Sequence, residues 1–457
     1  MAYQARRTGW RAGILAMGLG LTAMAAPARA ETLADALVSA YRHSNLLEQN
    51  RAVLRAADED VAGAIAALRP VFAFVAESGY ARTVQTSGYS ASIGLSASLS
   101  LFDSGRSRLS VLIAQETVLA TREALVQVEQ GVLLDAVSAY FDVRSALESV
   151  AINENSVRVI GEELRAAEDR FEVGEVTRTD VALAEAQLAA ARASAAAASG
   201  SLSVAREAYK AATGHYPATL APAPPTPALP ATLEEAKAIA LRTHPSVREA
   251  QRQVTVSELQ VRLAAAQRGP SVDASVQAGR NDNGQDTMSA GVSMSQTLYS
   301  GGSLSSLHRQ AIASRDRSRA ALLQTGVTIG QSVGEAWSNI AVARAQISAT
   351  EEQIRAATAA YNGVREEANL GARTTLDVLD AEQDLLDARA SRINAEASLQ
   401  VSIYSLLASM GLLTVEHLNL GIPTYDPAAY YEAVKNAPPT STQGKSLDRV
   451  LRAIGKE

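Results

Sequence analysis

The stretch Tyr89-Ser-Ala-Ser-Ile-Gly-Leu-Ser-Ala-Ser-Leu-Ser-Leu101 alternates strictly between apolar residues at odd positions and serine or glycine at even positions. This two-residue period predicts a β-strand with one apolar face and one small polar face. Thirteen residues at about 3.3 Å each are long enough to cross the hydrocarbon core of a bilayer at a moderate tilt. The period alone also suits an ordinary β-sandwich strand, so the surrounding sequence decides between the two.

Residues 1–30 have the pattern of a cleaved secretory signal. Three arginines precede an apolar run from Ala12 to Ala26, and Ala28-Arg29-Ala30 follows as a small-residue cleavage site. No later stretch of sequence is apolar for long enough to predict a transmembrane helix, so strands are the expected route into a membrane. Removing the signal takes away four arginines and no acid, which changes the net charge from −6 to −10 and argues against a nucleic-acid partner.

The rest of the chain reads as two copies of one unit. A shift of 197 residues places Gly371 on Gly174 and Gly411 on Gly214, and self-similarity at one offset indicates a repeated architecture. The expected divisions are a first repeat at 31–214, a proline-rich linker at 215–231, a second repeat at 232–411, and a C-terminal segment at 412–457 with a disordered tail.

Each repeat is predicted to contain a helix, a β-hairpin, a long helix and a returning helix. Proline ends the first helix, and loops rich in glycine, serine and asparagine join the strands. The long helices, free of proline, would extend about 100 Å at 1.5 Å per residue. Glycine ends each of them, and a threonine just beyond caps the returning helix. The predicted landmarks are helices at 46–68 and 246–267, strands from 71 to 80 and from 271 to 280, long helices to about Phe171 and Ala368, and caps at Thr177 or Thr179 and Thr374 or Thr375.

Apolar residues in the first long helix occur as adjacent pairs every seven residues. Val111-Leu112, Val118-Leu119 and Leu125-Val126 begin this series. A seven-residue repeat favours left-handed supercoiling, and a double seam indicates a helix wedged between two neighbours, as in a helical wall. A solitary coiled-coil stalk is the plainer alternative. The second copy fits less well, because Arg315-Asp316 occupies one seam pair.

With this duplicated order, the chain resembles the TolC family of outer-membrane efflux and secretion channels over nearly all of its length after the signal. The motifs that carry the resemblance are Ala139-Tyr140-Phe141, Arg170-Phe171-Glu172-Val173-Gly174, Thr179-Asp180-Val181, Ala212-Thr213-Gly214-His215-Tyr216-Pro217, Gly371-Ala372-Arg373-Thr374 and Asp377-Val378-Leu379-Asp380-Ala381.

The resemblance implies a mainly α fold with a membrane β-barrel portion. Four strands cannot close a barrel and open strand edges are not tolerated in a bilayer, so the chain is expected to oligomerise. By resemblance it is a homotrimer with a 12-stranded barrel among outer-membrane lipid and a coiled-coil α-barrel in the periplasm. The partners it implies are a periplasmic adaptor and an inner-membrane ABC or RND pump. The absence of cysteine excludes a lipid anchor and favours the TolC branch, with type I protein secretion or multidrug efflux as the function.

The sequence shows no constellation for catalysis, and we expect neither an enzyme nor a cofactor. The five histidines are scattered without metal-ligand spacing, and no phosphate-binding loop or nucleophile elbow is present.

Asp377 and Asp380 are the predicted constriction. They lie three residues apart at the start of the returning helix and hence on one face, so a threefold axis would turn them into two carboxylate rings that favour cations. Thr374 followed by Asp377 is also the ordinary pattern of a stabilised helix start. Resemblance to the family's aspartate constriction favours the gate.

Two further sets of residues follow from the resemblance. Arg373 is expected to pair with Thr179 or Asp180 as a weak latch that a docking partner displaces. Gly174 and Gly371 are the expected contact points for the adaptor, although capping alone also explains a glycine there. The position of the family's gate tyrosine is occupied by Ala368, which predicts a leakier resting state.

Two other classes remain as alternatives to a channel. A periplasmic adaptor has a helical hairpin but normally only one, flanked by compact β-domains. A soluble coiled-coil scaffold would explain the helices but not strands of membrane length.

Overall fold

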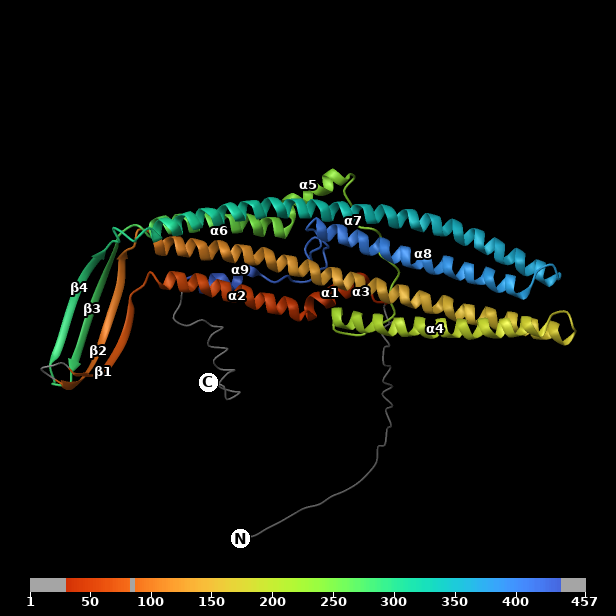
Figure 1. Ribbon diagram of the computed structural model, residues 1–457, viewed down its shortest axis with the longest axis horizontal. Helices are drawn as coiled ribbons and strands as arrows, with labels where there is room; N and C mark the ends of the chain where they lie inside the picture. Colours follow the sequence, from red (N-terminus) through yellow and green to blue (C-terminus); the bar gives the residue numbers. More distant parts are fainter. Residues whose placement is uncertain (1–29, 83–86, 437–457) are drawn as a thin grey trace, which may run out of the picture.

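The computed structural model describes residues 30–82 and 87–436 and shows a long bundle of helices with a sheet at one end (Figure 1). The signal, apart from its last residue, and the predicted disordered tail lie outside the described residues. The helices are α1 (Leu33–His43), α2 (Asn45–Ala66), α3 (Arg106–Glu172), α4 (Arg178–Thr213), α5 (Leu233–Thr243), α6 (Pro245–Ala266), α7 (Ser303–Asn369), α8 (Thr375–Ser409) and α9 (Pro427–Val434). The strands are β1 (Val71–Arg82), β2 (Ser87–Phe102), β3 (Ser271–Asn281) and β4 (Asp286–Ser295).

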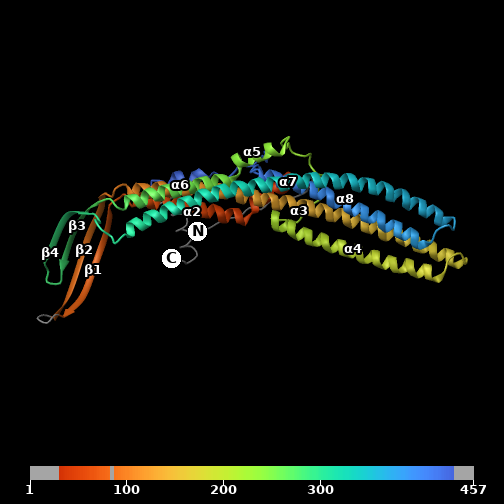
Figure 2. The ribbon, with the colours of Figure 1, turned by 45° about the horizontal axis from the view of Figure 1, so that its top comes forward.

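The helices form a wall of parallel rows. Helix α2 is followed end to end by α4, and this row lies beside α3; the row of α6 and α8 lies between α3 and α7 (Figures 1 and 2). Helices α3 and α7 have 67 residues each, about 100 Å at 1.5 Å per residue. The predicted wedging of the first long helix between two neighbours is therefore confirmed for α3.

Helix α7 lies at the edge of this wall, with a helix row on one side only. This position explains its weaker apolar pattern, because no second helix row covers its outer side; among the described residues, the short helix α5 packs there near the middle of α7. The Arg315-Asp316 pair on this helix forms an ion pair with 2.7 Å between nitrogen and oxygen.

The four strands form one antiparallel sheet in the order β1-β2-β3-β4. Both predicted hairpins are confirmed, and the two hairpins also pair with each other through β2 and β3. Strand β4 ends at Ser295, although the repeat equates Leu298 with Leu101 of β2. The reason is that its partner β3 begins only after Pro270, which has no N–H to donate.

The register gives the sheet one apolar face and one polar face across all four strands. Phe74 pairs with Leu95, Leu95 with Ala278, and Ala278 with Met288. The neighbouring rung places Ala73, Ser96, Gln277 and Ser289 together on the other face. The alternation predicted from β2 alone therefore extends through the whole sheet, since successive residues point to opposite faces.

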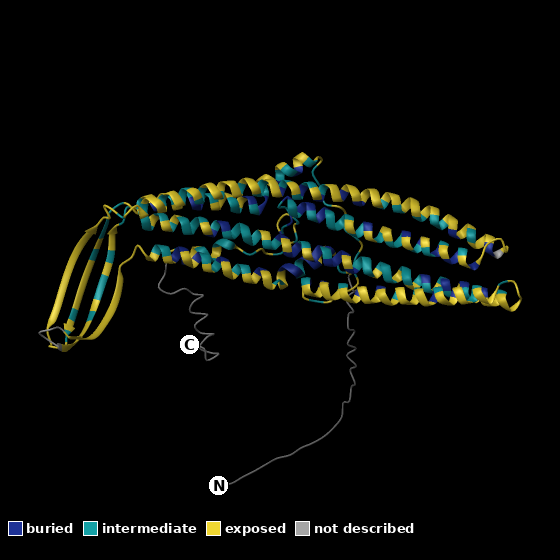
Figure 3. Ribbon diagram, in the orientation of Figure 1, coloured by how far each residue is buried: buried dark blue, intermediate teal, exposed yellow. Residues whose placement is uncertain are grey.

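The main core lies halfway along the helices, where Figure 3 shows the buried residues concentrated. Here the first helix of each repeat, the linker and the segment after α8 pack around α3, α7 and α8. Tyr140 is fully buried, and its hydroxyl donates to the carbonyls of Ala221, at 2.8 Å, and Glu31, at 3.2 Å. The Ala139-Tyr140-Phe141 motif thus ties the linker to the first repeat.

Within the described residues, no helix combines the length and the apolar character needed to cross a membrane.

Candidate functional site

The two helical hairpins turn at the end of the molecule farthest from the sheet (Figures 1 and 2). Gly174 and Gly371 have φ angles of +80° and +77°, a left-handed conformation that glycine adopts without strain. In each turn, the residue after the glycine donates its N–H to a carbonyl five positions earlier, at 2.9 Å in both. The predicted capping role is confirmed for both glycines.

Open space surrounds both of these glycines. No heavy atom outside the immediate turn lies within 4 Å of the place that a Cβ at Gly174 or Gly371 would occupy. Both glycines are therefore accessible at the tips, and the predicted adaptor contact stays a prediction.

Threonine and aspartate start both returning helices in the same way. Asp180 accepts the N–H of Thr177 at 2.8 Å, and Asp377 accepts the N–H of Thr374 at 2.9 Å, while each threonine hydroxyl accepts from the N–H of its aspartate. Of the predicted alternatives, Thr177 and Thr374 are the caps, and Thr179 lies inside α4. Hydrogen bonds from the threonines hold the pKa of both aspartates below the usual value, so these carboxyls stay ionised at neutral pH.

The exposed face of α8 carries two acids, Asp384 and Asp387, beyond the predicted pair. Asp380, Asp384 and Asp387 are exposed and Asp377 is half-buried, and their spacings of three, four and three residues place them on one face. The opposite face is buried and includes Val378. Asp384 lies seven residues after Asp377, and Asp387 seven after Asp380. This heptad spacing would have predicted a longer acidic stripe from the sequence.

Arg373 lies in the second tip, and its described partner is Glu367 on the same hairpin. Its Nε is 2.9 Å from a Glu367 carboxylate oxygen, and this hydrogen bond raises the pKa of Arg373. Both side chains are half-exposed. The expected contacts with Thr179 or Asp180 are absent from the described single chain and stay predictions for an assembly.

The two hairpins touch near the tips through another arginine. Arg170 Nη1 donates to the carbonyl of Ala368 at 3.4 Å. Ala368, at the position equated from the sequence with the family's gate tyrosine, is buried with Tyr361, Val378 and Leu385. A small side chain here fills a packed position between α7 and α8.

A buried acidic pair that was not predicted from the sequence lies further up the hairpins. Glu163 of α3 and Glu382 of α8 are 7% and 5% exposed. Arg365 of α7 forms an ion pair with Glu163 at 3.1 Å, and burial raises the pKa of Glu382. These residues connect three helix rows, and the packing of facing helices that buries them was not visible in the sequence.

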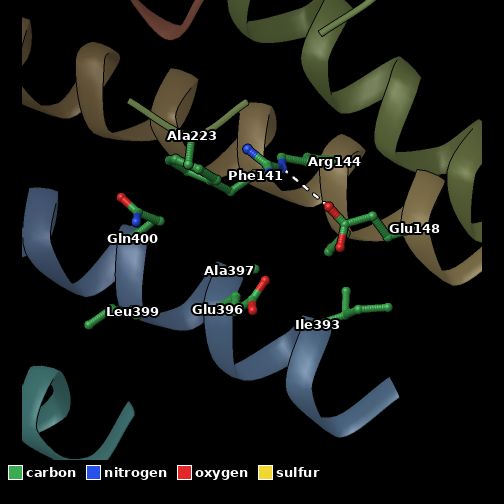
Figure 4. Close-up of a pocket in the computed structure, with 10 residues that line it drawn as sticks. Phe141, Arg144, Glu148, Ala223, Ile393, Glu396, Ala397, Leu399 and Gln400 are labelled. Atoms are coloured by element: carbon green, nitrogen blue, oxygen red, sulfur yellow. Dashed lines mark hydrogen bonds and ion pairs between the residues drawn. The ribbon is translucent and has the colours of Figure 1, made fainter. Parts of the chain in front are cut away.

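A cavity of about 240 Å³ lies between α3, α8 and the linker (Figure 4). Arg144 and Glu148 form a 3.3 Å ion pair on one wall, and Glu396 and Gln400 lie on the other. The lining offers no nucleophile paired with a base. Among the described residues, no group of three or more histidine or acidic side chains is placed to hold a metal ion.

Long paired helices, glycine tips and a two-faced sheet with open edges define the subunit of a tunnel-forming channel. The chain belongs to the outer membrane efflux protein family, whose model matches residues 36–215 and 238–412. It is 34% identical over 433 residues to the outer membrane efflux protein BepC of Brucella suis, covering 93% of this chain and 94% of that protein. It is 25% identical over 433 residues to the outer membrane protein TolC of Escherichia coli, covering 88% and 86%.

The fold comparison agrees with this assignment. A crystal structure of CusC aligns with a TM-score of 0.75 at 19% identity, covering 84% of this chain and 92% of that chain. A structure of the outer-membrane channel OprN aligns with a TM-score of 0.72 at 23% identity, covering 83% and 89%. The predicted TolC-like fold, outer-membrane location and efflux function are confirmed, and the adaptor and scaffold alternatives are wrong. The family consists of channels rather than enzymes.

Proposed function

We propose that this chain is the outer-membrane exit duct of a tripartite export system. Three copies close their sheets into a twelve-stranded barrel in the outer membrane, and their helices form one tunnel through the periplasm. An adaptor at the tips and an inner-membrane ABC or RND pump supply the substrate, in type I protein secretion or drug efflux.

The two-faced sheet with two open edges carries this proposal. Strands β1 and β2 have 12 and 16 residues, and a membrane-spanning strand needs about 9–11. An apolar face suits lipid and a polar face suits a wet lumen. Unpaired edges at β1 and β4 cannot stay open in hydrocarbon, so the β4 edge of one copy pairs with the β1 edge of the next.

The helix rows support the same closure. The row of α2 and α4 lies at one side of the wall and α7 at the other. Helix α2 leads into β1 and β4 leads into α7, so the helix rows follow the same order as the strands. Pairing β4 with a neighbour's β1 therefore also brings α7 beside a neighbour's α2 and α4. One contact closes both the barrel and the tunnel.

The tips form the tunnel entrance in this proposal. Rings of Asp377 and Asp380 focus negative potential on the axis and favour cations. Arg373, with Thr179 and Asp180 of an adjacent hairpin, holds the entrance closed until an adaptor binds around Gly174 and Gly371. The ionised state of Asp377 and the exposure of Asp380 support this role.

The absence of cysteine allows a direct test by engineered disulfides. Ala76 of β1 and Ala290 of β4 lie on the apolar face near the middle of the two edges. One cysteine is introduced into β1 and one into β4, and the pair of positions is scanned over neighbouring residues of that face. We expect at least one pair to give oxidised dimers and trimers in the outer membrane. Variants with one cysteine are the control. If every pair of cysteine positions gave only monomers after oxidation, the proposed closure would be contradicted.

A further inference from the structure

We infer that arginines at the junction of sheet and helices form a collar that binds the anionic headgroups of phospholipids in the periplasmic leaflet of the outer membrane. This inference rests on the proposed placement of the sheet in that membrane. The residues of this arginine collar are Arg69, Arg106, Arg108, Arg262, Arg268 and Arg309.

The collar is a local reversal of charge in an acidic protein. The four segments that join helices to strands, 64–70, 103–112, 262–270 and 300–312, contain six arginines and one acid, Asp103. The carboxylate of Asp103 is occupied by the N–H groups of Gly105 and Ser107, at 2.9 and 2.6 Å. The whole chain has a net charge of −6, so this band is positive against a negative background.

Four collar arginines have free guanidinium groups within the described residues. Arg108, Arg262, Arg268 and Arg309 are exposed and form no hydrogen bond or ion pair through these groups with any described residue. Further along the same helices, by contrast, Arg252 and Arg319 pair with Glu116 and Glu258, at 3.3 and 2.6 Å. The junction thus combines exposed, unpaired arginines with a single acid, whose carboxylate is already occupied.

The four free arginines share one level of the molecule. Arg108 is the third residue of α3, Arg309 is the seventh of α7, Arg262 lies four residues before the end of α6, and Arg268 lies two after it. At 1.5 Å per residue, all of them lie within about 10 Å of the sheet-side ends of their helices. The four helix ends meet the sheet at this level (Figure 1).

Exposed apolar and aromatic residues lie on the sheet side of the collar. Phe72, Phe102 and Tyr299, at the helix ends of their strands or just beyond, are 78%, 54% and 88% exposed. Aromatic side chains favour the border of hydrocarbon and water, and basic side chains just beyond favour phosphate groups. Arginine suits phosphate because its planar fork donates two parallel hydrogen bonds. The order in space, from apolar sheet through aromatic residues to free arginines, therefore fits an anionic phospholipid surface.

Lipid retention by the full-length purified protein tests the inference. Phosphatidylglycerol and phosphatidylcholine with identical acyl chains are added in equal amounts to the protein in neutral detergent, and the bound lipids are counted by native mass spectrometry. We expect about a threefold or greater excess of phosphatidylglycerol at low salt, falling towards equal binding in 0.5 M NaCl because salt screens exposed charges.

A matched pair of variants locates the site. The variant R108Q/R262Q/R268Q/R309Q is expected to bind the two lipids equally. The control R165Q/R178Q/R192Q/R206Q removes four exposed arginines from the tip half of the molecule and is expected to keep the preference. Equal loss in both variants, retention in the collar variant, or no salt-sensitive preference in the parent protein would overturn the inference.

The parent measurement at two salt concentrations needs no variant and so stands even where a quadruple variant fails to fold. Channel conductance measured on the same preparations separates the two proposals. If the collar variant loses the lipid preference but keeps normal conductance, the proposed duct still holds and the change concerns the collar alone.

Discussion

Replacing the buried carboxyl of Asp58 by an amide should stabilise the protein at neutral pH. Asp58 of α2 is fully buried, and neither of its carboxylate oxygens has a hydrogen-bond partner among the described residues. It lies on the same buried side of α2 as Leu54 and Val61, beneath the tyrosines around α9. Burial raises its pKa from 3.8 to about 6, although Arg122 acts in the opposite direction.

The magnitude follows from the two ionisation constants. The difference between 3.8 and about 6 corresponds to about 3 kcal/mol. Because the folded state holds the proton more tightly, this contribution to stability is fully present below pH 3.8. It is lost progressively as pH rises to about 6. The amide introduced by Asp58→Asn does not titrate, so D58N should gain up to about 3 kcal/mol over the parent chain between pH 4 and pH 7.5.

Denaturant unfolding of the detergent-solubilised protein at a series of pH values tests this prediction. The free-energy difference between D58N and the parent should grow between pH 4 and pH 6 and stay constant above. D60N, two residues along the same helix, removes an exposed carboxyl and should follow the parent at every pH. A D58N profile parallel to that of the parent would refute the assignment of a raised pKa to Asp58.

Three further predictions concern the helix ends. Arg373→Ala should raise single-channel conductance, because it removes a proposed latch at the entrance; an unchanged conductance would exclude that role. Thr374→Ala should destabilise the start of α8 by about 1 kcal/mol, since it removes a capping hydroxyl. Thr179→Ala, inside α4, should cost less than about 0.5 kcal/mol. Amide hydrogen exchange at the start of each returning helix measures both changes. Gly411→Ala should lower the thermal unfolding midpoint more than Gly174→Ala. Both glycines have positive φ, but only a Cβ at 411 would clash with backbone, 2.6 Å from the Cα of His244. Equal decreases in the midpoint would contradict this reasoning.

Local patterns predicted the elements well, and their contacts less well. The hairpin of β1 and β2, in which Tyr80 pairs with Tyr89, follows from alternation in two stretches that are close in the sequence, and both features are local. The pairing of Leu95 with Ala278 joins strands about 180 residues apart, and no periodicity specifies which edges meet. The wedged position of α3 was predictable because a double apolar seam requires two neighbours.

The candidate site divides in the same way. Capping by Thr374 and Asp377 was predicted because it depends on residues three apart. Arg373 pairs with Glu367 across a tight turn, where helix spacing no longer applies. Asp58 was missed, although its position in line with Leu54 and Val61 placed a charged residue on a buried face; such a break in an apolar stripe is a readable signal.

Single-channel recording in a planar bilayer tests the central claim most directly, that copies of this chain enclose a tunnel with an acidic entrance. The purified mature protein should give a small, steady, cation-selective conductance that multivalent cations block from the tip side only. D377N/D380N should lose this block, while D60N/E154Q, which neutralises two exposed acids elsewhere, should keep it. Folded oligomers that carry no current, or a block that survives D377N/D380N, would contradict the account.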